Sequence, residues 1–370
     1  MNAAANDLKQ TCLYNTHLKL GASISPFGGW LMPIQYTSII KEHHAARTHA
    51  ALFDTCHMGE FIIEGSSSLE DLEKIITFDV SVMGIGQCKY GMMCDEKGGV
   101  VDDLVLYRLS EKSFMLVANA STIESDFQWL MSHCSQTTTV RNISDSTAKL
   151  DLQGPASPRI MQSVVRNLSD PGYYHFTYVD FHGRKLIVSR TGYTGEIGFE
   201  IYSSPDEALE LWDVFISRGA VPAGLGARDT LRLEMGMPLY GHELSRERNA
   251  AESGFTRIFS PHKKFIGSEV IMNPSFMRQK LCGIELEGRR AARNGDTIGT
   301  LDSKSIGTIT SGSFAPSLGK AIAMGYVNTA ECYTGNKVII RTARDILNGI
   351  ITEMPFYKNA TGRRLMVEFL

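Results

Sequence analysis

The stretch Lys89–Leu109, KYGMMCDEKGGVVDDLVLYRL, predicts a β-hairpin. Its two apolar runs, YGMMC and VVDDLVLYRL, flank the turn Asp95–Gly99. The paired glycines of that turn, Gly98 and Gly99, supply the positive φ that a tight turn needs. We therefore expect two antiparallel strands that meet at a glycine turn.

The second strand of this hairpin carries two adjacent acids, Asp102 and Asp103. Successive side chains of a strand point to opposite faces, and here each acid shares its face with apolar residues. Both carboxylates should thus be at least partly buried, which costs several kcal/mol unless each is paired or hydrogen-bonded. Two explanations fit the pair equally well. In the first, the acids mark a strand end, where one of them faces water or caps a turn. In the second, one of them is a carboxylate of a functional site.

Helices and strands alternate around the hairpin as far as about Gly241. Ser38–Ala51 suits a helix with Ser38 as its N-cap, and Ser66–Ile76 suits a second helix. Further helices are expected over Ser125–Cys134 and Glu207–Arg218, and strands over Phe114–Asn119, Ala148–Leu152, Lys185–Ser189 and Gly198–Tyr202.

The character of the sequence changes after about Asn273. From Leu281 to Glu353, short β-rich runs such as CGIELEG and NKVIIR are separated by glycine turns. Regularly spaced short strands of this kind predict a small barrel or sandwich. We expect a domain boundary near residues 270–280, which divides the chain into 1–272 and 273–370.

The composition excludes several classes of protein. The chain has 370 residues, of which 43% are hydrophobic and 21% charged, as is typical of a soluble globular protein. Lys and Arg number 37 against 40 Asp and Glu, so the basic excess of a nucleic-acid-binding protein is missing. The sequence contains no run of about 18 apolar residues, the length that a membrane-spanning helix needs. The 7 scattered cysteines and a start without a signal pattern indicate the cytoplasm, although a mature organellar protein would look the same.

The sequence does not contain the common cofactor-binding motifs with the spacing that they require. Gly312–Lys320 has more residues between its glycines than a phosphate loop allows, and Ala321 replaces the hydroxyl residue that binds magnesium. Gly224–Gly226 starts a dinucleotide fingerprint, but Asp229 stands where the third glycine belongs. The histidines between residues 43 and 49 do not bring two imidazoles to one helix face, so we expect no metal site.

Two further clusters place charges in unusual surroundings. RTGYTGEIGFEIY, Arg190–Tyr202, winds through regularly spaced glycines and puts Glu200 among apolar neighbours in the strand FEIY. GLGARDTLRLEMGMPLYGHEL, Gly224–Leu244, suits a short helix capped by Asp229 or Thr230. A turn with one salt-bridged Glu explains the first cluster. An ion network within one helix explains the second. Neither explanation requires a functional site.

The three clusters together have the chemistry to bind a planar, nitrogen-rich heterocycle. A carboxylate accepts two N–H bonds from an amidine-like edge, a guanidinium meets a carbonyl oxygen, and aromatic rings such as Tyr90, Tyr193 and Tyr240 stack on the faces. Pterin has such an edge and such faces, but the residues alone do not single it out.

With these clusters, the chain resembles the T protein of the glycine cleavage system, an aminomethyltransferase, from about Thr16 to Tyr357. The resemblance rests on LFDTCHMGEF, DEKGGVVDDLVLYRL, VANASTIESDF, TGYTGEIGFEIY, GLGARDTLRLEMGMPLYGHEL and IGTITSGSFAPSLGKAIAMGYV. It implies an α+β fold with three domains in a cloverleaf around a central folate channel. Two interleaved, mixed α/β domains in residues 1–272 would form the folate-binding region, and residues 273–370 a C-terminal β-barrel.

The resemblance also implies a reaction and its participants. The enzyme would take the aminomethyl group from the lipoyl arm of the H protein and pass the one-carbon unit to tetrahydrofolate as co-substrate. Ammonia, 5,10-methylenetetrahydrofolate and the dihydrolipoyl arm would be the products. Asp103 matches the catalytic second acid of the family's GG-x-x-DD motif. Glu200 and Arg228 match the family's pterin-anchoring residues, and positions that line the folate channel are matched by Tyr90, Tyr193 and Asn119.

The chain departs from the family's pattern in three places. Cys56 stands where serine is usual, AAESGFTRIFS at residues 250–260 replaces an apolar stretch, and the tail after MPFYK diverges. The alternative functions are a folate-binding factor for iron–sulfur assembly and a folate-dependent demethylase of the same fold. The DD motif, the ARD helix and the TSG-F-P-x-LGK strand favour the aminomethyltransferase.

Overall fold

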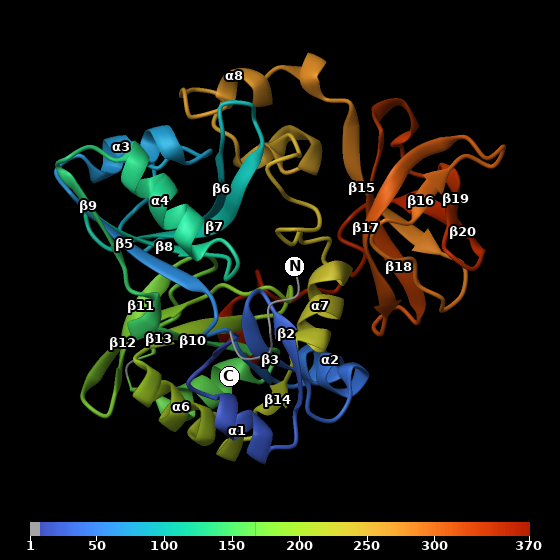
Figure 1. Ribbon diagram of the computed structural model, residues 1–370. Coiled ribbons are helices and arrows are strands. Elements are labelled where there is room, and N and C mark those ends of the chain that lie inside the picture. The colour runs from blue at the N-terminus through green and yellow to red at the C-terminus, as the bar shows by residue number, and fades with distance from the viewer. Residues whose placement is uncertain (1–7, 167) are drawn as a thin grey trace.

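The computed structural model describes residues 8–166 and 168–370, which form three lobes around a common centre (Figure 1). A five-stranded sheet and a six-stranded sheet, each with its helices, form two of the lobes, and a closed barrel forms the third. The architecture is therefore α+β with a C-terminal barrel, as expected. The finer division at residues 272 and 273 stays a prediction.

The five-stranded sheet contains the predicted hairpin. Its strand order is β6-β7-β8-β5-β9, and its apolar face packs against α3 and α4. In the hairpin turn Gly98 has a φ of 81°, whereas Gly99 is needed because a Cβ there would lie 2.1 Å from the carbonyl oxygen of Arg246. Only one of the two glycines thus supplies positive φ. The elements are β5 (Gly59–Gly65), α3 (Ser68–Ile75), β6 (Cys88–Cys94), β7 (Val100–Arg108), β8 (Ser113–Ala118), α4 (Ile123–His133) and β9 (Thr138–Asn142).

The six-stranded sheet has the order β11-β12-β13-β10-β4-β14. One face is apolar and packs against α5 and α6, while the other face is turned to the five-stranded sheet. Across that contact, Tyr107 of β7 donates a hydrogen bond of 2.8 Å to Tyr202 of β13 or accepts one from it. The elements are β4 (Ala51–Asp54), β10 (Ala148–Gln153), α5 (Ser157–Val164), β11 (Phe176–Phe181), β12 (Arg184–Ser189), β13 (Gly198–Ser203), α6 (Pro205–Ser217) and β14 (Val221–Ala223).

A small three-stranded sheet and three helices lie beside the six-stranded sheet. The predicted cap of α2 is confirmed, because Ser38 Oγ accepts a 3.2 Å bond from the Lys41 N–H. The predicted start of α7 is wrong: Gly224 is its N-cap, and Asp229 and Thr230 lie inside it. Gly224 packs so tightly on β3 that a Cβ would lie 2.3 Å from the Ile34 carbonyl group. The elements are β1 (Lys9–Gln10), α1 (Tyr14–Lys19), β2 (Ser23–Phe27), β3 (Trp30–Gln35), α2 (Ile39–Thr48) and α7 (Leu225–Glu234).

The third lobe is a closed barrel of order β15-β18-β17-β16-β19-β20, and not a sandwich. It follows α8 (Ser268–Ile271) and lies beside α7, as Figure 1 shows. In the described part of the chain, no helix is long and apolar enough to cross a membrane. The strands are β15 (Gln279–Leu286), β16 (Thr297–Gly299), β17 (Ser305–Ala315), β18 (Lys320–Asn328), β19 (Lys337–Arg341) and β20 (Ile346–Thr352).

Candidate functional site

The acids of β7 are held by residues of the neighbouring strands. Tyr90 of β6 donates from its hydroxyl to Asp103 Oδ2 at 3.0 Å, and Asn119 Nδ2, just after β8, donates to Asp103 Oδ1 at 2.8 Å. The same nitrogen donates to Asp102 Oδ1 at 2.7 Å, and Thr122 Oγ1 donates to Asp102 Oδ2 at 2.9 Å. Three of the predicted site residues are thus brought together, and one amide group joins the two acids.

Burial and mutual repulsion favour the protonated forms of these acids. Burial and the charge of Asp102 raise the pKa of Asp103, which is half-buried, to about 7. Burial and the neighbouring Asp126 of α4 hold the pKa of Asp102 well above its ordinary value, and burial raises the pKa of Asp126 to about 6. Asp103 therefore gains and loses a proton near neutral pH, as a general acid or base does.

Strand β10 adds buried polar residues that the sequence analysis did not include. The residues Ala148–Gln153 alternate, and the apolar ones face α5 and α6. Lys149, Asp151 and Gln153 share the opposite face, and none of them is more than 2% exposed. Alternation of this kind normally places polar side chains in water. The pattern AKLDLQ is visible in the sequence, but only partners from other elements, such as Met58 before β5 and Arg228 of α7, make this face part of a site.

Glu200 lies on β13, directly opposite Asp151 of β10. Its carboxylate forms a buried ion pair with the Lys149 ammonium through Oε1, and Oε2 accepts hydrogen bonds from Thr191 Oγ1 and, at 3.4 Å, from the Tyr107 hydroxyl. Burial alone would raise the pKa of Glu200, but the charge and hydrogen bond of Lys149, the hydrogen bond of Thr191 and the charge of Arg228 together outweigh burial and lower it. Glu200 is thus ionised, and both of its oxygens already have partners. The expectation of a salt-bridged Glu is confirmed, and an incoming ligand would compete with Lys149.

Arg228 of α7 is engaged in a similar way. Its Nη1 donates to Asp151 Oδ2 at 2.6 Å, and its guanidinium lies over the Tyr193 ring, 4.8 Å from the ring centroid. Burial raises the pKa of Tyr193, whose hydroxyl lies within electrostatic reach of both Asp103 and Arg228. Tyr193 therefore connects the two groups of predicted site residues, those around Asp103 and those around Glu200.

Two buried side chains beside Lys149 have polar atoms without partners among the residues that the structure describes. They are Glu60, through both carboxyl oxygens, and His57, through Nδ1. Burial raises the pKa of Glu60 well above its ordinary value and lowers the pKa of His57 to about 4. Burial therefore favours the uncharged form of both groups.

Helix α7 connects this site with the barrel. Arg232 Nη2 donates to Ser311 Oγ of β17 at 2.7 Å, and Glu234 accepts from Arg47 Nη2 of α2 at 2.8 Å. Within the helix, only the pair Arg232–Asp229, at 2.8 Å, matches the expected intra-helix ion network. The other charges of α7 in the described structure reach out to three different elements.

The three departures from the family's pattern lie at the site or at a contact between lobes. Cys56 Sγ donates to the backbone oxygen of Lys149 at 3.4 Å. Glu252 accepts hydrogen bonds of 2.8 and 3.0 Å from backbone N–H groups at the start of β15. In the tail, Thr361 Oγ1 accepts from the Ile197 N–H at 2.9 Å, beside the strand that carries Glu200.

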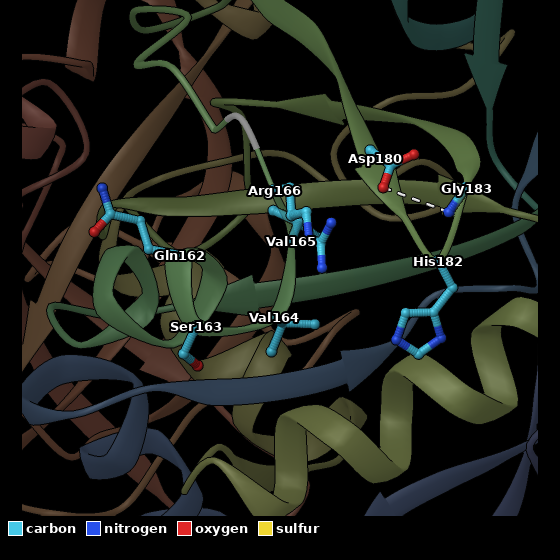
Figure 2. A pocket seen from close by; sticks show the side chains of 8 residues that line it. All are labelled: Gln162, Ser163, Val164, Val165, Arg166, Asp180, His182 and Gly183. Carbon is cyan, nitrogen blue, oxygen red and sulfur yellow. Dashed lines mark hydrogen bonds between the residues drawn. The ribbon is translucent and has the colours of Figure 1, made fainter.

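Two surface hollows lie outside the site or at its edge. Figure 2 shows one of about 420 Å³ between the end of α5 and the β11–β12 hairpin. No predicted site residue lines it. A narrower crevice reaches Thr191 and Gly198, next to Glu200, and its volume of about 10 Å³ has room for roughly one water molecule. The first hollow is lined by Gln162, Ser163, Val164, Val165, Arg166, Asp180, His182 and Gly183.

The site combines an acid that titrates near neutral pH, two buried ion pairs and two tyrosine rings. This set can hold a polar heterocycle and move a proton on it. Among the residues that the structure describes, no three His, Cys, Asp or Glu side chains are grouped so that they could hold a metal ion.

Comparison with known families gives a match over most of the chain. Residues 13–263 match the GCVT N-terminal domain, and residues 279–358 match the glycine cleavage T-protein C-terminal barrel domain.

Individual proteins are similar along nearly their whole length. An aminomethyltransferase from Halothermothrix orenii is 42% identical over 357 residues, which cover 94% of this chain and 100% of that protein. An aminomethyltransferase from Thermotoga neapolitana is 39% identical over 364 residues, with coverages of 96% and 99%. The crystal structure of glycine cleavage system aminomethyltransferase T from Bartonella henselae is similar with a TM-score of 0.89 and 30% identity, over 96% of this chain and 99% of that one.

Proposed function

Because the chain belongs to the glycine cleavage T-protein family of aminomethyltransferases, we propose that it transfers a one-carbon unit from the H protein to tetrahydrofolate. The donor is the aminomethyl group held as a thio-adduct on the lipoyl arm. The products are ammonia, 5,10-methylenetetrahydrofolate and the dihydrolipoyl arm. Since the relatives are bacterial proteins, we place the reaction in the cytoplasm.

The observation that carries this proposal is the environment of Asp103. Its pKa of about 7 allows the carboxyl group to hold or release a proton under working conditions. Beside the reacting nitrogens of the folate, the ionised form would favour attack by N5 and stabilise the iminium-like carbon. Tyr90 and Asn119 hold the two carboxyl oxygens in place, at 3.0 and 2.8 Å.

The other residues suit the pterin ring. Tyr90 and Tyr193 offer aromatic faces. Arg228 carries five N–H donors, and the bond to Asp151 through Nη1 leaves others for a carbonyl oxygen of the ring. Glu200 would accept the amidine-like edge after Lys149 has given way. These roles remain proposals for each residue.

The H protein brings the reacting carbon on a long, flexible arm. The net charge of −3 at pH 7 creates little long-range attraction, so docking would depend on local charges and be weak and moderately salt-dependent.

The test is a turnover assay with lipoylated, aminomethyl-loaded H protein and tetrahydrofolate, in which ammonia and 5,10-methylenetetrahydrofolate are measured. Both products should appear together, and the free aminomethyl-lipoamide adduct should be a much poorer donor. Equal turnover with the free adduct would contradict a protein partner. Folate binding without transfer from either donor would contradict the proposed reaction and favour the iron–sulfur assembly function.

A further inference from the structure

Lys149 sits at the centre of the buried polar face between the two sheets. Its ammonium group contacts Glu200 Oε1 of β13 and, at 3.4 Å, the sulfur of Met58, which precedes β5. The side chains of Lys149 and Glu200 are only 2% and 7% exposed. An ammonium has three N–H donors, and a thioether is a weak acceptor. The group is therefore well placed to take a second carboxylate.

Glu60 offers that carboxylate. It lies on β5 on the face that is turned to the six-stranded sheet, opposite Val117 of β8. Neither of its carboxyl oxygens has a partner among the described residues, although Glu60 is only 1% exposed. A buried polar group in this state lowers the stability of the fold. No contact in the described structure compensates this cost, so a role in another state of the site would explain the residue.

A ligand that binds Glu200 creates a problem for Lys149. Because both Glu200 oxygens are in use, a ligand can take Oε1 only if the ammonium leaves it. A buried ammonium without a counter-ion is strongly unfavourable. The ammonium must therefore find another acid within the protein.

We propose that Glu60 is the second counter-ion of Lys149, so that binding of the folate edge to Glu200 turns the Lys149 ammonium to Glu60, which releases its proton to solvent. The inference rests on the proposed function, since it takes folate as the ligand. Before binding, Glu60 is a neutral acid and Lys149 pairs with Glu200. After binding, Lys149 pairs with ionised Glu60 and Glu200 accepts the ligand's N–H groups. One proton leaves, and both residues act as positioning residues for the substrate.

The charges around Glu60 agree with this exchange. The titratable groups that face it are Lys149 of β10 and Glu200 and Tyr202 of β13. Lys149 favours the ionised form of Glu60, whereas burial and the charge of Glu200 oppose it. When a ligand covers Glu200 and the ammonium moves closer, the balance shifts towards ionisation.

The exchange also selects the ligand. A compound can displace the ammonium only if it presents two neighbouring N–H groups that both bind the carboxylate. A ring with a single donor at this edge would leave Lys149 in place. Affinity for folate should therefore rise with pH as long as Glu60 of the free protein is protonated, and level off once the free protein has lost this proton.

The first experiment is calorimetric titration of tetrahydrofolate into the full chain in two buffers with different ionisation enthalpies. The wild-type protein should release about one proton more on binding than Glu60→Gln, which cannot ionise but is isosteric with the protonated acid. Affinity should fall about tenfold or more in Glu60→Gln, the size of one lost charge-assisted hydrogen bond. Glu64→Gln, on the same strand but exposed and paired with Arg141, is the matched control and should behave as wild type.

The second experiment uses infrared difference spectroscopy and needs no folate for its first part. The free wild-type protein should show the carbonyl band of a protonated carboxyl that Glu60→Gln lacks, and this band should disappear when folate binds. Folate binding with an unchanged band, and with equal proton release in wild type and Glu60→Gln, would overturn the inference. Failure of the wild type to bind folate at all would instead contradict the proposed function.

Discussion

The two parts of the candidate site treat their carboxylates in opposite ways. Around Asp103, the partners are a hydroxyl and an amide, and the nearest charge is another acid, so its pKa rises to about 7. Around Glu200, a buried ammonium compensates the charge, and the pKa falls. The first acid is prepared to exchange a proton, and the second to keep a fixed charge.

The burial of the two side chains explains the difference, since β7, β10 and β13 are all interior strands of their sheets. Glu200 is buried, so its charge needs a counter-ion. Asp103 is half-buried on β7, where hydrogen bonds and partial exposure suffice. An acid that is buried without a cation therefore has a raised pKa and can exchange a proton. An acid that is buried beside a cation stays ionised and keeps a fixed charge.

The largest effect is expected for the stability of Glu200→Ala. The substitution removes the Lys149 ammonium's partner, and Glu60 can replace it only after losing its proton, so the free energy of unfolding should fall by up to about 3–5 kcal/mol. Denaturant unfolding measures this loss. A second substitution, Lys149→Met, should restore much of it. If Glu200→Ala is as stable as wild type, the ion pair between β10 and β13 does not stabilise the fold.

Asp103→Asn should abolish most turnover without weakening folate binding. A preorganised charge in a water-poor site contributes about 10²–10³ in rate, and the amide keeps the shape of the carboxyl group. In the wild type, turnover should rise with pH through about pH 7, because the ionised carboxylate is the active form, and this rise should be absent in the variant. Steady-state rates and folate titrations at several pH values measure both effects.

The control for this variant is Asp206→Asn on the exposed start of α6. Asp102→Asn cannot serve, because Asn119 Nδ2 binds both acids, at 2.7 and 2.8 Å. Full activity of Asp103→Asn per folded molecule would show that Asp103 is a structural residue of the strand.

Asp103→Asn should also make the protein more stable above pH 7, by about 1–2 kcal/mol after allowance for partial exposure. The pKa of Asp103 is raised from 3.8 to about 7, so the folded state binds more protons than the unfolded state between these values. This contribution therefore lowers wild-type stability as pH rises from about 4 to about 7. Thermal unfolding of both proteins at pH 5 and pH 8 gives the test. An equal difference at the two pH values would show that the fold does not raise this pKa.

The smallest effect is expected for Cys56→Ser. Cys56 Sγ donates to the Lys149 backbone oxygen at 3.4 Å, and a serine hydroxyl can make the same bond. The change in the free energy of unfolding should stay below about 1 kcal/mol, and activity should be unchanged. A large loss of activity would mean that the region around Lys149 and Glu200 depends on the thiol itself.

Local patterns made much of the fold predictable. The hairpin at Asp95–Gly99, the Ser38 cap and the strands of the barrel depend on residues that are close in sequence. The start of α7 did not follow from the sequence, because contact between Gly224 and Ile34 of another strand sets it.

The candidate site was only partly predictable for the same reason. Asp103 stood out because two adjacent acids interrupt an apolar strand. Lys149 and Asp151 did not, since an alternating strand is ordinary until elements distant in sequence cover its polar face, as Met58 and Arg228 do here. Glu60 gave no sign at all, because only the three-dimensional structure shows a lone acid without a partner in the described chain.

Helix α7 fixes the relative positions of three elements that it contacts. Arg228 reaches β10, Arg232 reaches β17, and Glu234 reaches α2, each from its own turn or side of one rigid rod. Insertion or deletion of a single residue before Arg228 would rotate all three side chains by about 100° and break every one of these contacts at once. Length changes within residues 225–234 should therefore be barred during evolution, and chimaeras between relatives should tolerate crossover points only outside this helix.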